Sequence, residues 1–369
     1  MIPNPQPRAL FLGSLYAGHS TRFMNLRRHV QTDGRLKAEF RTVSGWQDCG
    51  RIEQMPILPR GLKGRLRAVS EASVFGRLNR PDVIWTSCGA EITPFAWTQI
   101  RPLRRPLIFD LDATYTQLEE MAPIYWDRPP RKGLHGSRGR MLDAIHRRSV
   151  TLFTPWSNWA AEGLKRDGVD SDSIRVLPPG VDLSVWQPVK RDSGDRPMRL
   201  LFVGGDFRRK GGPELLRAVA ARPGAFETVL VTREDPGVLP DSVRVVRATP
   251  NSSELLGLYR WADLFVLPTK AECFGIATVE AMASALPVIV TSIGGAPDIV
   301  EDGVTGWMVE PREAALAAAL DSALAHRDDL AAMGSRGRRR AEEQFNGARN
   351  DRVIVDWLME LTETAGTRR

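Results

Sequence analysis

The sequence predicts an α/β protein built from two doubly wound domains. Its 369 residues exceed what one ordinary core supports. Short apolar runs alternate with segments of helical periodicity, which is typical of parallel sheets covered on both faces. A Pro- and Asp-rich stretch from Asp182 to Pro197 interrupts this alternation as a linker does. We therefore expect domains at 1–187 and 188–345, and a last helix at 346–369 that packs back on the first domain.

The individual elements follow from this alternation. In the first half we expect strands at Ala9–Leu12, Val83–Trp85, Leu107–Phe109 and Thr151–Phe153, and helices at Arg22–Val30, Lys63–Leu78, Met141–Arg148 and Trp156–Arg166. In the second half we expect strands at Leu200–Val203, Thr228–Val231, Val243–Val246, Leu264–Leu267 and Val288–Val290, and helices at Pro213–Ala221, Ser253–Arg260, Gly275–Ser284, Ala314–Leu324, Asp328–Gln344 and Asn350–Leu361.

Composition restricts the class of protein. Hydrophobic residues make up 42% of the chain and charged residues 26%, as in a folded globular protein. No run approaches the roughly 20 apolar residues of a membrane span, and Ala9–Leu12 is too short for a signal-peptide core. The scattered Cys49, Cys88 and Cys273, with five dispersed histidines, indicate neither a disulfide framework nor a metal site. We expect a cytoplasmic protein with no metal and no bound cofactor.

Positive charge is concentrated in the N-terminal half. Residues 1–190 hold 28 Lys and Arg against 18 Asp and Glu, whereas the remainder holds 23 against 26. A basic surface attracts an anionic partner such as a membrane, a phosphorylated acceptor or nucleic acid. The basic run from Arg128 to Arg140 is either a loop that contacts such a partner or a solvated surface loop. An Arg-rich genome composition explains the excess equally well.

The densest cluster of candidate functional residues lies at 271–282. The strand Leu264–Leu267 ends just before it, so the cluster belongs to the edge of the sheet where open parallel sheets bind ligands. A helix begins near Phe274, and its first backbone N–H groups, with the positive end of its dipole, suit a phosphate. Gly275 lets the backbone approach a ligand closely, and Ile276 follows it. We expect Phe274, Gly275 and Ile276 to bind a ligand that carries a phosphate group.

Two glutamates belong to this cluster. Glu272 lies in the loop before the helix, where its carboxylate can accept hydrogen bonds from sugar hydroxyls. Glu280 lies within the first turns of the helix, where it can reach a ribose diol. The alternative is structural: Glu272 caps the helix and Glu280 is a solvated helical residue.

A second cluster opens the second domain. Gly204 and Gly205 follow a strand, and the cations Arg208, Arg209 and Lys210 precede a helix. Lys210 supplies a point charge and an arginine a planar fork, an arrangement suited to a diphosphate. The pattern is neither a Walker loop nor Gly-x-Gly-x-x-Gly.

Together these clusters resemble the retaining glycosyltransferases of family 4, which have the GT-B fold of two Rossmann-like domains facing across a cleft. The motifs that carry the resemblance are Glu272-x7-Glu280, Gly294-Gly295, Asp302–Trp307 and, upstream, Ile174–Asp182. It extends from about Thr151 to about Glu310 and is faint before Thr151, in the part that binds diverse acceptors in that family.

The resemblance implies transfer of a sugar from a nucleoside-diphosphate donor, with retention of configuration and without a metal. Lys210 would neutralise the leaving diphosphate, Glu272 would orient the donor sugar and Glu280 would bind the ribose. The departing phosphate would help to deprotonate the acceptor, which would be a carbohydrate, a lipid-linked molecule or a natural product. Polysaccharide biosynthesis is one such setting.

The second domain departs from the family at one position. Members usually carry an arginine directly after the glycine that aligns with Gly204, and here Gly205 stands there. The second cation at the diphosphate would therefore have to be Arg208 or Arg209.

In the first domain, many members carry a histidine after the strand that we expect at Leu107–Phe109, and here Asp112 follows that strand. We expect Asp112 to face the transferred sugar as a catalytic residue, although strand-end aspartates are often only turn residues. Gly18 and His19, in the loop after the first strand, are candidates for acceptor binding. A capping loop with a surface histidine is the alternative.

Two other classes of function compete with glycosyl transfer. A nucleotide-sugar epimerase has a similar architecture, but the surroundings of Glu272 and Glu280 and the lack of clustered acid–base residues disfavour it. A noncatalytic basic protein on a membrane or nucleic acid is disfavoured by two ligand-binding sheets and by the lack of an aromatic-basic module. We expect no nucleic-acid partner, and a cytoplasmic location that permits peripheral contact with the inner membrane face through the basic N-terminal domain.

Overall fold

The computed structural model describes residues 6–14, 17–43, 51–52, 54–58, 63, 66–67, 70, 81–87, 105–189 and 195–367. The chain forms two compact units. The first comprises Met1–Glu120, Pro129–Pro179 and Ala348–Arg369, and the second comprises Met121–Arg128 and Gly180–Gly347. Cys49, Cys88 and most of the helix expected at Lys63–Leu78 lie outside the described residues.

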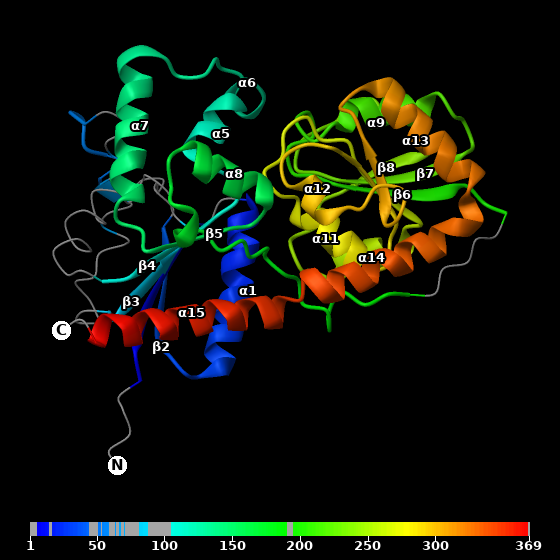
Figure 1. Cartoon of the computed structure of the whole chain (residues 1–369). Helices are drawn as coiled ribbons and strands as arrows, with labels where there is room; N and C mark the ends of the chain where they lie inside the picture. The colour runs from blue at the N-terminus through cyan, green and yellow to red at the C-terminus, as the bar shows by residue number, and fades with distance from the viewer. Residues whose placement is uncertain are drawn as a thin grey trace. The chain divides into compact units, whose positions relative to one another are not determined.

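The first unit contains a parallel sheet, which has five strands in the described residues, in the order β2-β1-β3-β4-β5 (Figure 1). The strands are β1 (Arg8–Ser14), β2 (Lys37–Val43), β3 (Val83–Thr86), β4 (Leu107–Leu111) and β5 (Leu152–Pro155). The helices are α1 (Ala17–Asp33), α5 (Tyr115–Glu120), α7 (Gly133–Arg147), α8 (Asn158–Arg166), the short 3-10 helix η3 (Ser171–Ser173) and α15 (Gly347–Thr367). Strand β2 was not expected from the sequence, because this edge strand is mostly half-buried and carries charged residues between its apolar ones.

The core of the first unit joins the sheet to helices from both ends of the chain. Phe11 of β1 and Trp85 of β3 are fully buried in one cluster with Leu26 of α1. Ile354 and Leu358 of α15 belong to the same cluster, and Figure 1 shows α15 beside α1 and β2. The C-terminal helix therefore completes the core of the unit that the N-terminus begins.

The second unit contains another parallel sheet, with six strands in the order β11-β10-β9-β6-β7-β8 among the described residues. The strands are β6 (Met198–Val203), β7 (Phe226–Val231), β8 (Val243–Val246), β9 (Leu264–Leu267), β10 (Val288–Thr291) and β11 (Gly306–Val309). The helices are α6 (Ala122–Tyr125), α9 (Gly212–Ala220), α10 (Ser253–Trp261), α11 (Ile276–Ala283), α12 (Ala296–Ile299), α13 (Glu313–Ala325), the 3-10 helix η4 (Arg327–Asp329) and α14 (Leu330–Gln344). Strand β11 was not expected, because only its first residue is buried.

Local sequence explains most of these elements. The central strands β9 and β10 are apolar apart from Thr291 and buried throughout, as expected where helices cover both faces of a parallel sheet. Helix α10 begins where the Oγ atom of Ser252 accepts the N–H of Leu255 at 3.1 Å. In the part of the chain that the structure describes, no helix is both long and apolar enough to cross a membrane.

Each sheet has a point at which its strand order changes direction. This point lies between β1 and β3 in the first sheet and between β6 and β9 in the second. The loops that leave the carboxyl ends of such adjacent strands diverge to opposite faces and leave a crevice in which open α/β sheets bind ligands. The loops after β6 and β9 therefore form the candidate site of the second unit.

Candidate functional site

The loop between β6 and α9 depends on its glycines. A Cβ atom on Gly204 would lie 2.8 Å from Cγ of Lys210, so the bare backbone lets the lysine stem fold against it. Gly211 ends the loop with a φ of 80° and caps α9. A Cβ atom on Gly211 would lie 2.0 Å from the carbonyl oxygen of Pro268, just after β9. The loops after β6 and β9 are therefore in close contact.

Lys210 and Glu272 meet where these two loops approach each other. The ammonium group of Lys210 donates a hydrogen bond to Oε2 of Glu272, and the side chains remain 15% and 12% exposed. The sequence indicated both residues, 62 positions apart, but not their contact. The carboxylate compensates the charge of the lysine while both groups keep some access to solvent.

The two arginines of the loop differ in their surroundings. Arg209 donates from Nε to Asp206 at 2.9 Å and from Nη1 to the carbonyl of Ala271 at 2.8 Å, so it ties the two loops together. Its guanidinium also lies 4.4 Å from the ring centroid of Tyr125. Arg208 is exposed, and its side chain makes no hydrogen bond or ion pair with any described residue. Asp206 and Tyr125 were not given roles from the sequence.

The start of α11 has the backbone geometry expected of a binding loop. Gly275 is the N-cap with a φ of 104°, a conformation that favours glycine. No side chain caps this helix, so the alternative that Glu272 is its capping residue is wrong. Ile276 is the first helical residue, and the first amides of a helix have no carbonyl partner within it. Phe274 is buried, with its ring centroid 6.2 Å from that of Phe345.

The Gly294-Gly295 pair supports the same loop. A Cβ atom on Gly294 would lie 1.9 Å from the carbonyl oxygen of Glu272, and its φ is 59°. The N–H of Gly295 donates to the carbonyl of Cys273 at 2.9 Å. These glycines allow the segment after β10 to pack directly against the backbone that carries Glu272.

Glu280 is buried within α11, with only 6% of the residue exposed. The hydroxyl of Tyr259 donates to its Oε2 atom at 3.0 Å. Burial raises the pKa of the Glu280 carboxyl to about 7, although the hydrogen bond from Tyr259 opposes this rise. The alternative of a solvated helical residue is therefore wrong. No pattern in the sequence indicates Tyr259, since α10 and α11 meet only in the tertiary structure.

In the first unit, His19 and Asp112 form a pair at the carboxyl edge of the sheet. Nε2 of His19 lies 3.1 Å from Oδ1 of Asp112, and the imidazole ring centroid is 4.7 Å from that of Trp156. Burial lowers the pKa of His19 and is the largest single effect, but the charge of Asp112, the hydrogen bond to it and the charge of Asp110 together outweigh burial, so the net shift of the pKa is upward. His19 and Gly18 lie in the first turns of α1 and not in a loop, and the His19 side chain is only 16% exposed. The alternative of a surface histidine in a capping loop is wrong.

A buried charge network lies beside this pair. Asp110 accepts hydrogen bonds from Oγ1 of Thr154 at 2.9 Å and from Nε1 of Trp156 at 2.8 Å. Arg22 of α1 donates to Asp110 at 3.3 Å and also to Asp351 of α15. Because Asp112 follows Asp110 by two residues, this network fixes the strand end that carries Asp112. No sequence motif marks Arg22 or Asp351 as members of such a network.

The basic run between Arg128 and Arg140 is only partly a loop. Arg131 and Lys132 precede α7, whereas Arg138 and Arg140 lie within it, and all four side chains are exposed. The expectation of a continuous basic loop is therefore wrong for its second half.

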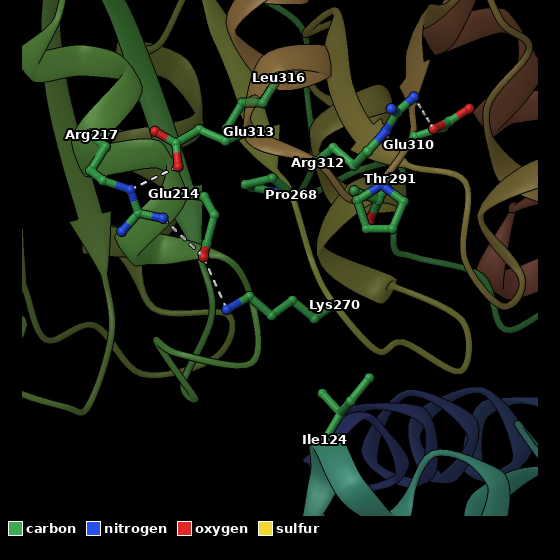
Figure 2. A pocket seen from close by; sticks show the side chains of 11 residues that line it. Ile124, Glu214, Arg217, Pro268, Lys270, Thr291, Glu310, Arg312, Glu313 and Leu316 are labelled. Carbon is green, nitrogen blue, oxygen red and sulfur yellow. Dashed lines mark hydrogen bonds and ion pairs between the residues drawn. The ribbon is translucent and has the colours of Figure 1, made fainter.

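A cavity of about 430 Å³ opens in the second unit, near the carboxyl ends of β9 and β10 (Figure 2). The residues that line it are Ile124, Glu214, Arg217, Pro268, Lys270, Thr291, Glu310, Pro311, Arg312, Glu313 and Leu316. Its charges are largely paired, because Glu214 contacts both Arg217 and Lys270. None of the sequence-predicted site residues lines this cavity, and no sequence pattern indicates it.

Two doubly wound parallel sheets with this strand order define the GT-B class of fold. Sucrose-phosphate synthase from Thermosynechococcus elongatus has a similar structure, with a TM-score of 0.80 over 97% of this chain and 100% of that chain at 20% identity. HepE from Anabaena, in a crystal structure with UDP-glucose, gives a TM-score of 0.68 over 96% of this chain and 99% of that chain at 17% identity. These similarities confirm the predicted fold.

The sequence of the second unit resembles a known family. Residues 238–340 match the family model described as Glycosyl transferases group 1. D-inositol 3-phosphate glycosyltransferase from Arthrobacter sp. (strain FB24) is 34% identical over an alignment of 202 residues, and the match covers 48% of this chain and 48% of that protein. The chain spans about half the length of the curated relatives it matches. This region of the chain is similar to the group 1 glycosyltransferases, which confirms the resemblance seen in the sequence.

Proposed function

We propose that this protein transfers a sugar from a nucleoside-diphosphate sugar to an acceptor. The observation that carries the proposal is the Lys210–Glu272 pair, which lies between two loops at the switch point of the second sheet. A cation, a partly accessible carboxylate and a helix N-terminus at one sheet edge suit a ligand with both phosphate and hydroxyl groups.

Each group in this arrangement has a role in donor binding. Lys210 and the first amides of α11 hold the diphosphate and stabilise the negative charge that grows on it as it leaves. Glu272 accepts hydrogen bonds from hydroxyls of the donor sugar, and Glu280 binds the ribose. Because protein groups supply the positive charge, the reaction proceeds without a divalent cation.

The first unit binds the acceptor beside Gly18 and His19. Asp112 stabilises positive charge on the sugar ring in the transition state, and the departing phosphate accepts the proton of the acceptor hydroxyl. The product keeps the anomeric configuration of the donor. The acceptor is a carbohydrate, a lipid-linked molecule or a natural product. The protein works in the cytoplasm, and its basic N-terminal half permits contact with the inner face of the membrane.

Donor hydrolysis tests this function without knowledge of the acceptor. The purified chain is incubated with UDP-, GDP-, ADP- and dTDP-sugars, with EDTA or with Mg²⁺, and the products are identified by proton NMR. We expect slow release of free sugar from nucleotide sugars that carry one or two of these bases, even with EDTA present. Conversion to an epimeric nucleotide sugar would support the epimerase alternative. No binding of any nucleotide, while oligonucleotides or anionic vesicles bind, would support a noncatalytic basic protein.

A further inference from the structure

An arginine from a neighbouring strand contacts the glycine pair of the β6–α9 loop. Strands β6 and β7 pair in register up to Val203 and Val231, and the N–H of Gly204 donates to the carbonyl of Val231 at 2.9 Å. The segments that follow these strands therefore start side by side. A Cβ atom on Gly205 would lie 2.9 Å from both Nε and Nη2 of Arg233. The guanidinium of Arg233 thus occupies the space that a side chain at 205 would need.

The backbone does not require glycine at position 205. The φ of Gly205 is not positive, whereas Gly211 in the same loop has a φ of 80°. A side chain at 205 would instead have to displace the guanidinium, the far end of an exposed side chain, which lies against Gly205 as the stem of Lys210 lies against Gly204. Two cationic side chains therefore flank the glycine pair, one from each of two adjacent loops.

The charges around the pair leave Arg233 uncompensated. Lys210 is paired with Glu272, and Arg209 with Asp206. Arg233 is exposed, and no carboxylate of the described residues lies within ion-pair distance of it.

The neighbouring residue holds this segment in position. Oε2 of Glu234 accepts the N–H of Phe207, within the β6–α9 loop, at 3.0 Å. The backbone next to Arg233 is therefore fixed to the loop that the guanidinium contacts, and this cation is placed without being neutralised.

We propose that Arg233 is the second cation of the diphosphate site and acts beside Lys210. Position 205 is glycine so that this guanidinium can reach the ligand from the end of β7. A diphosphate carries at least two negative charges, and the ammonium group of Lys210 already shares its charge with Glu272. The planar fork of an arginine can bind two phosphate oxygens at once. This inference rests on the proposed function, because it assigns a residue to the donor site.

Calorimetric binding to UDP, GDP, ADP and dTDP, and to the matching nucleosides, tests the assignment. For the base that wild type prefers, Arg233→Ala should weaken diphosphate binding at least about 10-fold, the effect of losing one charged hydrogen bond. Binding of the nucleoside should not change. Arg260→Ala is the matched control, because Arg260 is exposed in the last turn of α10, which leads into the amino end of β9 and away from the carboxyl ends of the strands.

Moving the arginine from position 233 to position 205 provides a second test. Gly205→Arg alone should weaken diphosphate binding, because the new side chain collides with Arg233 and places a like charge beside it. In combination with Arg233→Ala it should restore most of the affinity, since an arginine at 205 then occupies the vacated space. Circular dichroism and thermal unfolding of each variant separate loss of binding from loss of folding.

The outcomes distinguish this inference from the function on which it rests. If wild type binds no nucleoside diphosphate, the proposed function fails and Arg233 loses its role with it. If Lys210→Ala loses affinity while Arg233→Ala binds as wild type does, the donor site stands and the inference is overturned. Loss of affinity in Arg208→Ala but not in Arg233→Ala would overturn it in favour of the loop arginine. Equal loss for nucleoside and diphosphate in Arg233→Ala would also overturn it.

Discussion

Glu280 makes the stability of the second unit depend on pH in a way that one substitution should remove. Burial raises the pKa of its carboxyl from 4.5 to about 7. In the unfolded chain the group loses its proton near pH 4.5, whereas the folded chain holds the proton to about pH 7. Between these values unfolding releases a proton, so the free energy of unfolding falls as pH rises. Below pH 4.5 and above pH 7 this group adds no further slope.

The magnitude follows from the size of the shift. One pKa unit corresponds to about 1.4 kcal/mol, so the shift of Glu280 costs about 3 kcal/mol once pH exceeds 7. Glu280→Gln keeps the shape of the side chain and an oxygen that accepts the hydroxyl of Tyr259, but it cannot ionise. The variant should match wild type near pH 4.5 and become more stable by about 3 kcal/mol above pH 7.

Native-state hydrogen exchange measures this difference in the unit concerned. Amides of β9 and β10 report unfolding of the second unit, and those of β1 and β4 report the first unit, whose pH dependence should be the same in both proteins. Glu343→Gln is the control, because Glu343 is exposed on α14. Parallel pH curves for wild type and Glu280→Gln would refute the reasoning, since they would mean that the buried carboxyl titrates as it does in the unfolded chain.

Three further results are expected. Lys210→Met should weaken binding of a nucleoside diphosphate by about 2 kcal/mol, measured by calorimetry, with little effect on folding; unchanged affinity would remove Lys210 from the site. Arg22→Met should destabilise the first unit by about 3–5 kcal/mol, because Asp351 then keeps a buried charge without this arginine. Hydrogen exchange checks this: the β1 amides should exchange faster, while the β9 amides should exchange as in wild type. Asp112→Asn should lower the pKa of His19, followed by NMR of its ring protons, and should reduce kcat more than it changes the donor KM; a His19 titration that does not move would contradict the pairing.

The sequence by itself determined most of the elements and the order of the candidate loops. Strands such as Leu264–Leu267 and caps such as Ser252 depend on residues that are neighbours in the chain, so periodicity and capping patterns predict them. The edge strand β2 was missed because charged residues interrupt its apolar ones, whereas β11 was missed although Trp307, Met308 and Val309 are apolar. The cluster around Glu272 could be placed at a sheet edge, since a strand precedes it and a helix follows.

Only the tertiary structure decided which side chains share an environment. Glu280 carries no sign in the sequence of its burial against Tyr259, which depends on how α10 and α11 pack. Gly205 is an ordinary turn glycine in the sequence, and only the fold shows that the guanidinium of Arg233, 28 residues further along, lies against it. Burial, pairing and pKa depend on contacts between segments far apart in the chain, and local pattern carries no information about such contacts.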